Sequence, residues 1–190
     1  MAGKRRRYLL NTNVPLSAFF EELARGEGVN VDPVTHRWLR VYGALSYYLG
    51  RLLRHEVARI RERLLGAKEY GGVGEALSYT RVKRILDAYN VARLGGVKIP
   101  TGTVARWRRL LRREYGVEVS AADVAYMLVA KSRGLVLVTY DTGVHQAASI
   151  IGVAVVKPWG VPRGPQDIGG SRRPGGHGGE ARKAREKRRR

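Results

Sequence analysis

Two apolar segments of this chain each end on a polar side chain of the kind that binds metal ions or phosphate groups. Residues 8–14 read Tyr-Leu-Leu-Asn-Thr-Asn-Val, so Asn11 follows three apolar residues. Residues 135–141 read Leu-Val-Leu-Val-Thr-Tyr-Asp, so Asp141 closes a second apolar run. Ligands of open α/β sheets bind beyond the carboxyl ends of the strands. Asn11 and Asp141 are therefore predicted to lie at such an edge.

Glu56 is a third candidate, because it interrupts an apolar row with helical spacing. The apolar members of that row are Leu45, Leu49, Leu52, Ile60 and Leu64. A carboxylate directed at a core is costly unless it is paired or binds a metal. The structural alternative is a salt bridge with Arg54, Arg59 or Arg63 at the edge of the apolar stripe.

Asp123 is the fourth candidate and also has a structural alternative. Ser120-Ala-Ala-Asp123 is a capping-box arrangement with Asp in place of the usual Glu, and it predicts a helix from Ser120. A carboxylate has two oxygens, so the cap and a ligand role can coexist. The alternative for Asp141, which precedes Thr142 and Gly143, is a turn-forming residue.

The order of these residues resembles that of the PIN-domain family. The opening strand of that family usually ends Asp-Thr-Asn, a later strand ends Thr-x-Asp, and a third acid begins the helix before that later strand. In this chain the motifs read Asn11-Thr12-Asn13 and Thr139-Tyr140-Asp141, and Asp123 has the place of the third acid. The resemblance covers roughly residues 8–157 and is strongest in 8–17 and 117–157.

The resemblance implies an α/β fold, a three-layer α/β/α sandwich with a central parallel sheet. It also implies a metal-dependent endoribonuclease with Asn11, Glu56, Asp123 and Asp141 at the catalytic positions. Glu56, Asp123 and Asp141 would be the ligands of Mg²⁺ or Mn²⁺, which prefer hard oxygen donors. His145 would either line the same cleft or simply begin a helix, and the histidines show no metal-ligand spacing.

Asn11 stands where the family usually carries its first acid. An amide is a poorer ligand than a carboxylate, and its NH₂ group repels a cation. Three interpretations stay open: a lapsed catalyst, an engineered inactivating change, or a site that works with three acids and one metal. Asn11 as a plain turn residue after a strand is a fourth.

The charge of the chain predicts a polyanionic partner. The 190 residues carry 36 Lys and Arg against 16 Asp and Glu, a formal charge of +20. Residues 1–7 contribute +4, residues 163–190 contribute +7, and the remaining +9 belongs to the part between them. Such a field attracts nucleic acid through phosphate neutralisation and counterion release. The absence of cysteine excludes disulfides, iron–sulfur clusters and thiolate zinc sites.

Two segments are candidates for RNA contact. The first is a predicted helix over residues 103–115, where Trp107 offers an apolar anchor or a stacking surface; a solvated helix face is the alternative. The second is the Gly- and Arg-rich tail, of a composition that orders on RNA. The candidate contacts are Arg106, Arg108, Arg109, Arg112, Arg113, Arg172, Arg173, Arg188, Arg189 and Arg190.

The sequence divides into a basic arm (1–7), a PIN-like domain (8–160) and a basic tail (161–190) that is expected to be disordered unless bound. Strands are predicted over 8–10, 135–140 and 153–156, with a flexible loop at 71–74. Helices are predicted over 14–24, with Asn13 as its cap, and over 34–65, 77–94, 103–115, 120–133 and 145–150.

The leading hypothesis is an RNA-binding PIN-domain protein, a metal-dependent ribonuclease whose activity is weakened or lost through Asn11. The alternative is a non-catalytic RNA-binding protein associated with the ribosome or ribosomal RNA. With no apolar run of ~18 residues and no signal peptide, a cytoplasmic location without membrane contact is expected. Few thermolabile residues hint at a thermophile. The oligomeric state and any antitoxin-like or ribosomal protein partner stay open.

Overall fold

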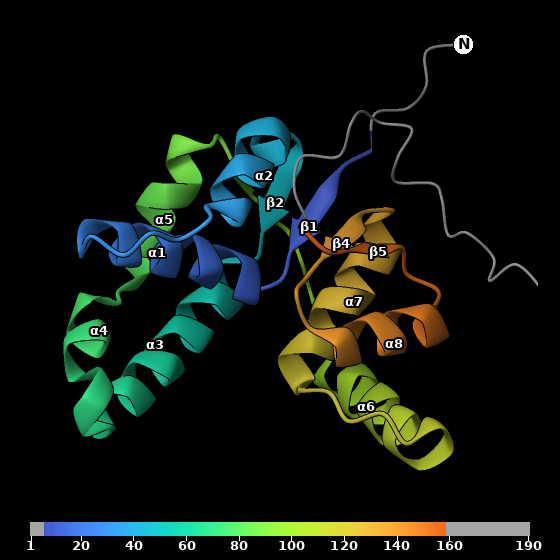
Figure 1. The fold of residues 1–190 in the computed structure, drawn as a ribbon. Coiled ribbons are helices and arrows are strands. Elements are labelled where there is room, and N and C mark those ends of the chain that lie inside the picture. The colour runs from blue at the N-terminus through green and yellow to red at the C-terminus, as the bar shows by residue number, and fades with distance from the viewer. Residues whose placement is uncertain (1–5, 159–190) are drawn as a thin grey trace, which may run out of the picture.

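The computed structural model describes residues 6–158, which form an α/β fold with a parallel five-stranded sheet. The strands are β1 (Tyr8–Leu10), β2 (Ser46–Tyr48), β3 (Ala92–Arg93), β4 (Val136–Val138) and β5 (Val155–Val156). Their order in the sheet is β3-β2-β1-β4-β5, and every neighbouring pair is parallel. The expected three-layer arrangement, with helices on both sides of a central parallel sheet, is confirmed (Figure 1).

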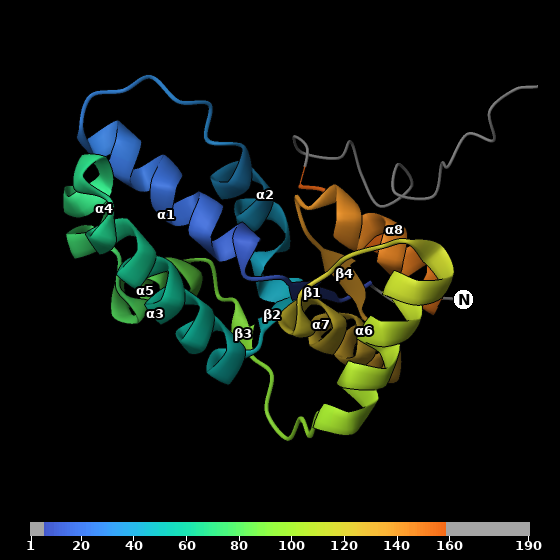
Figure 2. The same cartoon turned by 90° about the horizontal axis from the view of Figure 1, so that it is seen from below.

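The helices fall into two groups, one on each side of the sheet (Figure 2). The α-helices are α1 (Asn13–Gly26), α2 (Val34–Tyr42), α3 (Gly50–Gly66), α4 (Gly71–Ala76), α5 (Tyr79–Ala88), α6 (Thr101–Tyr115), α7 (Ala121–Arg133) and α8 (Thr142–Ile151). Short 3₁₀ turns occupy Gly43–Leu45 and Lys68–Tyr70. No helix within residues 6–158 is long and apolar enough to cross a membrane.

Side chains of β1 alternate between two hydrophobic clusters. Tyr8 and Leu10 pack with residues of α1, α2, α3 and α5. Leu9 points to the other side, where it packs with Leu137 and with residues of α6, α7 and α8. This period of two is the geometry of a strand buried on both faces, and it explains the unbroken apolar runs of β1 and β4.

The predicted helix over 34–65 is wrong, because β2 lies in its middle. α2 ends at Tyr42, and Ser46 pairs with Tyr8 of β1. Gly43 marks the break: a Cβ added there would stand 2.2 Å from the backbone oxygen of Tyr89. Aromatic residues such as Tyr47 and Tyr48 favour strands. The apolar spacing that suggested one helix runs across two helices and a strand.

Two further predictions in this part of the chain are also wrong. The helix expected over 77–94 ends at Ala88, and the chain turns at Asn90, which has a left-handed φ of 56°, before entering β3. The expected flexible loop at 71–74 is instead the start of α4. Its Gly74 packs against α3, with a Cβ position 2.9 Å from the Leu65 nitrogen.

The elements in the C-terminal part agree better with the sequence. α7 begins after a complete capping box made by Ser120 and Asp123, as predicted. The strands are shorter than expected, and α8 begins earlier, at Thr142, with Asp141 as its N-cap. Asn13 is not the cap of α1, because Thr12 holds that position and Asn13 lies in the first turn.

Gly43→Ala should destabilise the protein by about 1–3 kcal/mol, the usual cost of overpacking a filled site. The added methyl group would displace the backbone of Tyr89. The midpoint of urea unfolding measures the effect. Gly72→Ala is the matched control, since nothing lies within 4 Å of its Cβ position and alanine favours a helix. Equal midpoints for the two variants would show that the close approach at Gly43 is not needed.

Candidate functional site

Asn11 and Asp123 meet at the carboxyl edge of the sheet. Asn11 follows β1, and Asp123 lies in the first turn of α7. The Asn11 Nδ2 group donates a hydrogen bond to Asp123 Oδ1 at 2.9 Å. Asn11 is only 3% exposed, so this hydrogen bond is shielded from solvent on the Asn11 side. The structure thus brings together two of the four residues that the resemblance assigns to the catalytic positions.

The carboxylate of Asp123 is bonded through both of its oxygens. Oδ2 accepts hydrogen bonds from the Ser120 Oγ group at 2.6 Å and from the Ser120 backbone nitrogen at 3.2 Å. Oδ1 accepts from Asn11. The helix-capping role and a role at the sheet edge thus coexist on one side chain.

Asn13 joins the ends of β1 and β4 and so positions the segment that leads to Asp141. Its Nδ2 group donates to Thr139 Oγ1 at 2.8 Å, and its Oδ1 accepts from the Tyr140 nitrogen at 3.3 Å. Asp141 is exposed, and its Oδ1 accepts from the Val144 nitrogen at 3.1 Å. Asp141, for which a turn-forming residue was the structural alternative, is the N-cap of α8. His145 is partly buried beside it and its Nε2 contacts the Thr139 carbonyl oxygen at 3.1 Å.

A buried tyrosine lies at this edge of the sheet. Tyr126 of α7 is 1% exposed and shares a 3.0 Å hydrogen bond with Thr12 Oγ1. Burial raises the pKa of the Tyr126 hydroxyl, and the negative charges of Glu56 and Asp123 raise it further. Both carboxylates therefore act on the same phenol. Glu56 itself is partly buried and forms a 2.8 Å ion pair with Arg59, one of its three predicted partners.

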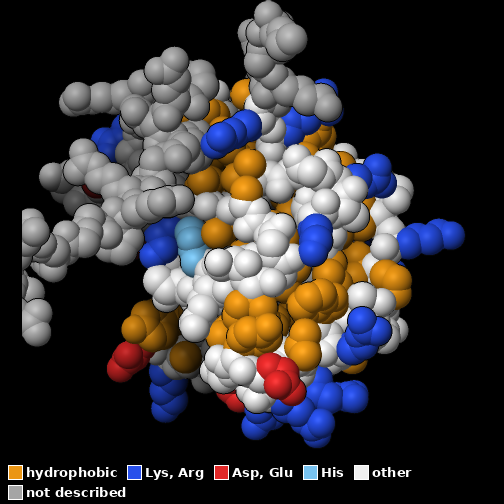
Figure 3. Space-filling model, turned by 90° about the vertical axis from the view of Figure 1, so that its right-hand side faces the viewer, with side chains coloured by type: hydrophobic (Ala, Val, Ile, Leu, Met, Phe, Trp, Pro, Cys, Tyr) orange, Lys and Arg blue, Asp and Glu red, His pale blue; other side chains and the backbone are white. Residues whose placement is uncertain are grey.

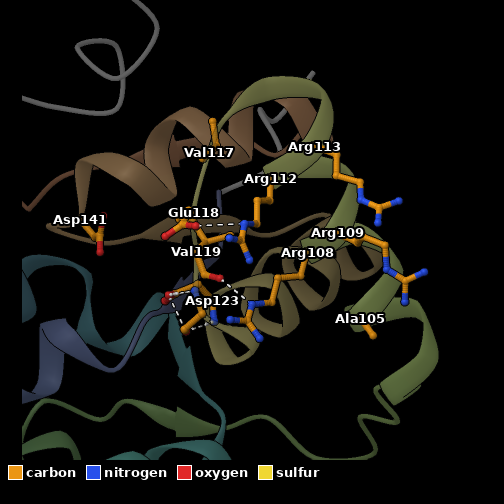
Figure 4. A pocket seen from close by; sticks show the side chains of 11 residues that line it. Ala105, Arg108, Arg109, Arg112, Arg113, Val117, Glu118, Val119, Asp123 and Asp141 are labelled. Carbon is orange, nitrogen blue, oxygen red and sulfur yellow. Dashed lines mark hydrogen bonds and ion pairs between the residues drawn. The ribbon is translucent and has the colours of Figure 1, made fainter.

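A pocket of about 810 Å³ opens beside Asp123 between α6 and the start of α8 (Figure 4). Asp123 and Asp141 both line it, opposite arginines of α6. Its lining residues are Ala105, Arg108, Arg109, Arg112, Arg113, Val117, Glu118, Val119, Ser120, Asp123 and Asp141. Guanidinium and carboxylate side chains therefore share one cavity.

The arginines of this pocket differ in their partners. Arg108 Nε donates to the Val119 carbonyl oxygen at 3.1 Å, and Arg112 pairs with Glu118 at 3.2 Å. Arg109 and Arg113 point outward in Figure 4 and make no hydrogen bond or ion pair with another residue of the described range 6–158. Their donors are available to a ligand.

The other predicted RNA-binding residues lie elsewhere. Arg106 is exposed on α6 but does not line the pocket. Trp107 is partly buried against the second hydrophobic cluster, which makes it an anchor for α6 rather than a free stacking surface. Five predicted contacts lie outside the described residues: Arg172, Arg173, Arg188, Arg189 and Arg190.

The arrangement does not fit a divalent metal ion. Within residues 6–158, no three Asp, Glu or His side chains lie close enough together to hold one. Glu56, Asp123 and Asp141, the predicted ligands, do not form such a group. Asn11 directs an N–H donor at Asp123, and Arg59 is paired with Glu56. Asp123 and Glu56 each already accept a hydrogen bond from an N–H donor at the position where a cation would have to bind.

Sequence reasoning missed three residues of this site. Thr12 and Thr139 stand inside the motifs that were considered, but no signal distinguished their hydroxyl groups. Tyr126 lies in an apolar helix, and its only signal is a hydroxyl group in a segment that is otherwise suited to full burial.

Comparison with known proteins gives matches among solved structures alone, since no protein-family model and no curated protein matches. FitAcB from Neisseria gonorrhoeae is 23% identical, with a TM-score of 0.48 over 80% of this chain and 98% of that chain. FitAB bound to an IR36 DNA fragment is 24% identical, with a TM-score of 0.49 over 81% and 96%. PAE2754 from Pyrobaculum aerophilum is 22% identical, with a TM-score of 0.44 over 80% and 91%. The fold assignment itself rests on the sheet and its two helical layers.

Proposed function

We propose that this protein binds RNA through α6 and the pocket beside it, and that Asn11 has weakened or abolished metal-dependent cleavage at the sheet edge. The observation that carries the proposal is the pocket in which four arginines of α6 adjoin Asp123 and Asp141. The choice of RNA, and of a PIN-like ribonuclease as the origin of the site, comes from the resemblance of the motifs at Asn11 and Asp141.

The charge distribution supports binding of a polyanion. Figure 3 views the molecule from its right-hand side in Figure 1, and Lys and Arg side chains gather at its lower end, where α6 lies in Figure 1. The exposed ion pair between Arg112 and Glu118 contributes little to stability, because both side chains are 75% exposed and screened by solvent. Arg112 can therefore exchange Glu118 for a phosphate at low cost.

An active metal-dependent ribonuclease is the second candidate. It is favoured by Asp123 and Asp141, which line the same pocket and match two of the acids of the PIN motifs. It is disfavoured by the Asn11 N–H group that faces Asp123.

The remaining alternative is a non-catalytic RNA-binding protein associated with the ribosome. It is tested by using ribosomal RNA as a competitor in the binding assay.

The double variant Arg109→Gln/Arg113→Gln should bind a labelled single-stranded RNA at least about tenfold more weakly than the unmodified protein. Two phosphate contacts contribute about 1.4 to the slope of log K against log salt for a single strand, so the slope should fall by that amount. Fluorescence anisotropy over a series of salt concentrations measures both quantities.

Arg40→Gln/Arg84→Gln is the matched control. These arginines are also exposed, and they lie on α2 and α5, on the other side of the molecule (Figure 1). The control removes the same charge but should lose little affinity. Equal losses in both double variants would refute a localised site on α6. DNA of the same sequence, measured in parallel, tests the preference for RNA.

A further inference from the structure

The ion pair between Glu56 and Arg59 has an asymmetric exposure. Arg59 Nη2 donates to Glu56 Oε2 at 2.8 Å. The Glu56 side chain is 15% exposed, whereas that of Arg59 is 45% exposed. The carboxylate of Glu56 is thus largely shielded from solvent. The guanidinium of Arg59 is accessible and keeps N–H donors that Glu56 does not use.

The helix that carries this pair, α3, begins directly after β2, at the same carboxyl edge of the parallel sheet where Asn11 meets Asp123. One turn earlier on α3, Leu52 packs against the second hydrophobic cluster, which contains most of α7. Burial raises the pKa of the Tyr126 hydroxyl, and the negative charges of Glu56 and Asp123 both add to that shift. Because residues three and four apart share a helix face, Arg59 lies one turn beyond Glu56 on the same side of α3.

We propose that Arg59 supplies the positive charge at this edge of the sheet and binds a phosphate of the RNA there without a divalent metal. This inference rests on the proposed function and adds a contact on a second helix. The guanidinium has five N–H donors, and one of them is sufficient for Glu56. The remaining donors form the planar fork that binds phosphate oxygens in pairs.

The position of α3 suggests the path that a bound RNA strand would follow over the surface. α7 lies between α3 and α6 in both ribbon views (Figures 1 and 2). The arginines of the pocket belong to α6 and Arg59 belongs to α3, so helices on opposite sides of α7 carry the two sets of donors. An RNA strand that contacts both crosses the edge where Asn11 donates to Asp123. The donors of Asn11 and Arg59 leave Asp123 and Glu56 partnered, which lowers their repulsion of the phosphates.

The test compares Arg59→Gln with Arg61→Gln in the full chain. Arg61 is exposed, makes no ion pair with another residue in the described part, and points about 200° away around the helix. In EDTA, Arg59→Gln should weaken binding of single-stranded RNA about tenfold and lower the salt slope by about 0.7, the value of one phosphate contact. Arg61→Gln should change the RNA affinity and the salt slope by less than Arg59→Gln does.

Two further measurements separate RNA contact from a structural role. Glu56→Gln removes the charge that competes for Arg59, so its RNA affinity should be equal to or above that of the unmodified protein. The unmodified protein should bind RNA equally well in EDTA and in magnesium chloride at equal ionic strength. The inference is overturned if Arg59→Gln matches Arg61→Gln, or if binding disappears in EDTA.

The α6 double variant distinguishes failure of this inference from failure of the proposed function. If Arg109→Gln/Arg113→Gln loses RNA binding while Arg59→Gln keeps it, the proposed contact at Arg59 is refuted and the proposed site on α6 is supported. If all of these variants bind RNA as well as the unmodified protein does, the proposed function is refuted as well.

Discussion

Asn11→Asp should make the stability of this protein depend on divalent cations. The change replaces an N–H donor, 2.9 Å from Asp123 Oδ1, with a second carboxylate at a position that is 3% exposed. An unpaired charge at such a site costs about 3–5 kcal/mol. Mn²⁺ bound between the two carboxylates would offset that cost, by about 2.7 kcal/mol at a concentration 100 times its Kd. Thermal unfolding in EDTA and in manganese chloride measures both effects.

Asn11→Leu is the control, because it removes the same hydrogen bond without adding charge. It should be less stable than the unmodified protein and should gain nothing from Mn²⁺. With Mn²⁺ present, Asn11→Asp should also cleave RNA, whereas the protein with Asn11 should cleave poorly or not at all. If the folded Asn11→Asp variant gains neither stability nor cleavage, the edge is not a lapsed metal site, and the protein is an RNA-binding scaffold.

Deletion of residues 163–190 should lower RNA affinity more than any single substitution. This segment lies outside the described residues, and the expectation rests on its composition: ten basic against three acidic side chains, a net +7 of the total +20. If all seven net charges neutralise phosphates, the salt slope for a single strand falls by about 5. Anisotropy titrations of the truncated and full chains over a range of salt concentrations measure the difference.

A full-length variant with the ten basic and three acidic residues of the segment changed to Gln is the control for chain length, because it removes the same net +7 as the deletion. It should resemble the truncated protein in both affinity and slope. An unchanged slope in the truncated protein would show that the segment does not contact phosphates and that binding belongs to α6 and its neighbours.

The parts of the fold that could be predicted are those specified by neighbouring residues. Ser120 and Asp123 define the start of α7 because a capping box is a local structure, and β1 and β4 are apolar runs of strand length. β2 could not be found in the same way. Its residues Ser46 to Tyr48 form a strand because they pair with β1 and β3, which lie far away in the sequence.

The same distinction applies to the site. The contact between Asn11 and Asp123 was predictable from the resemblance, which assigns both residues to the catalytic positions. The role of Tyr126 was not predictable, because its burial and its hydrogen bond to Thr12 depend on the packing of α7 against a part of the chain more than 100 residues earlier. The sequence left Glu56 three candidate arginines, and the geometry of α3 selects Arg59.

β1 is made early but lies in the middle of the sheet. Its neighbour β4 begins at Val136, so Leu9 remains without its partner Leu137 until most of the domain has been synthesised. Parallel pairings over such sequence separations form slowly, because the chain between them must be ordered first. On a translating ribosome, Leu9, which is fully buried in the finished protein, would therefore face water on one side of an incomplete sheet. We expect that surface to be the one at which nascent chains aggregate or engage chaperones.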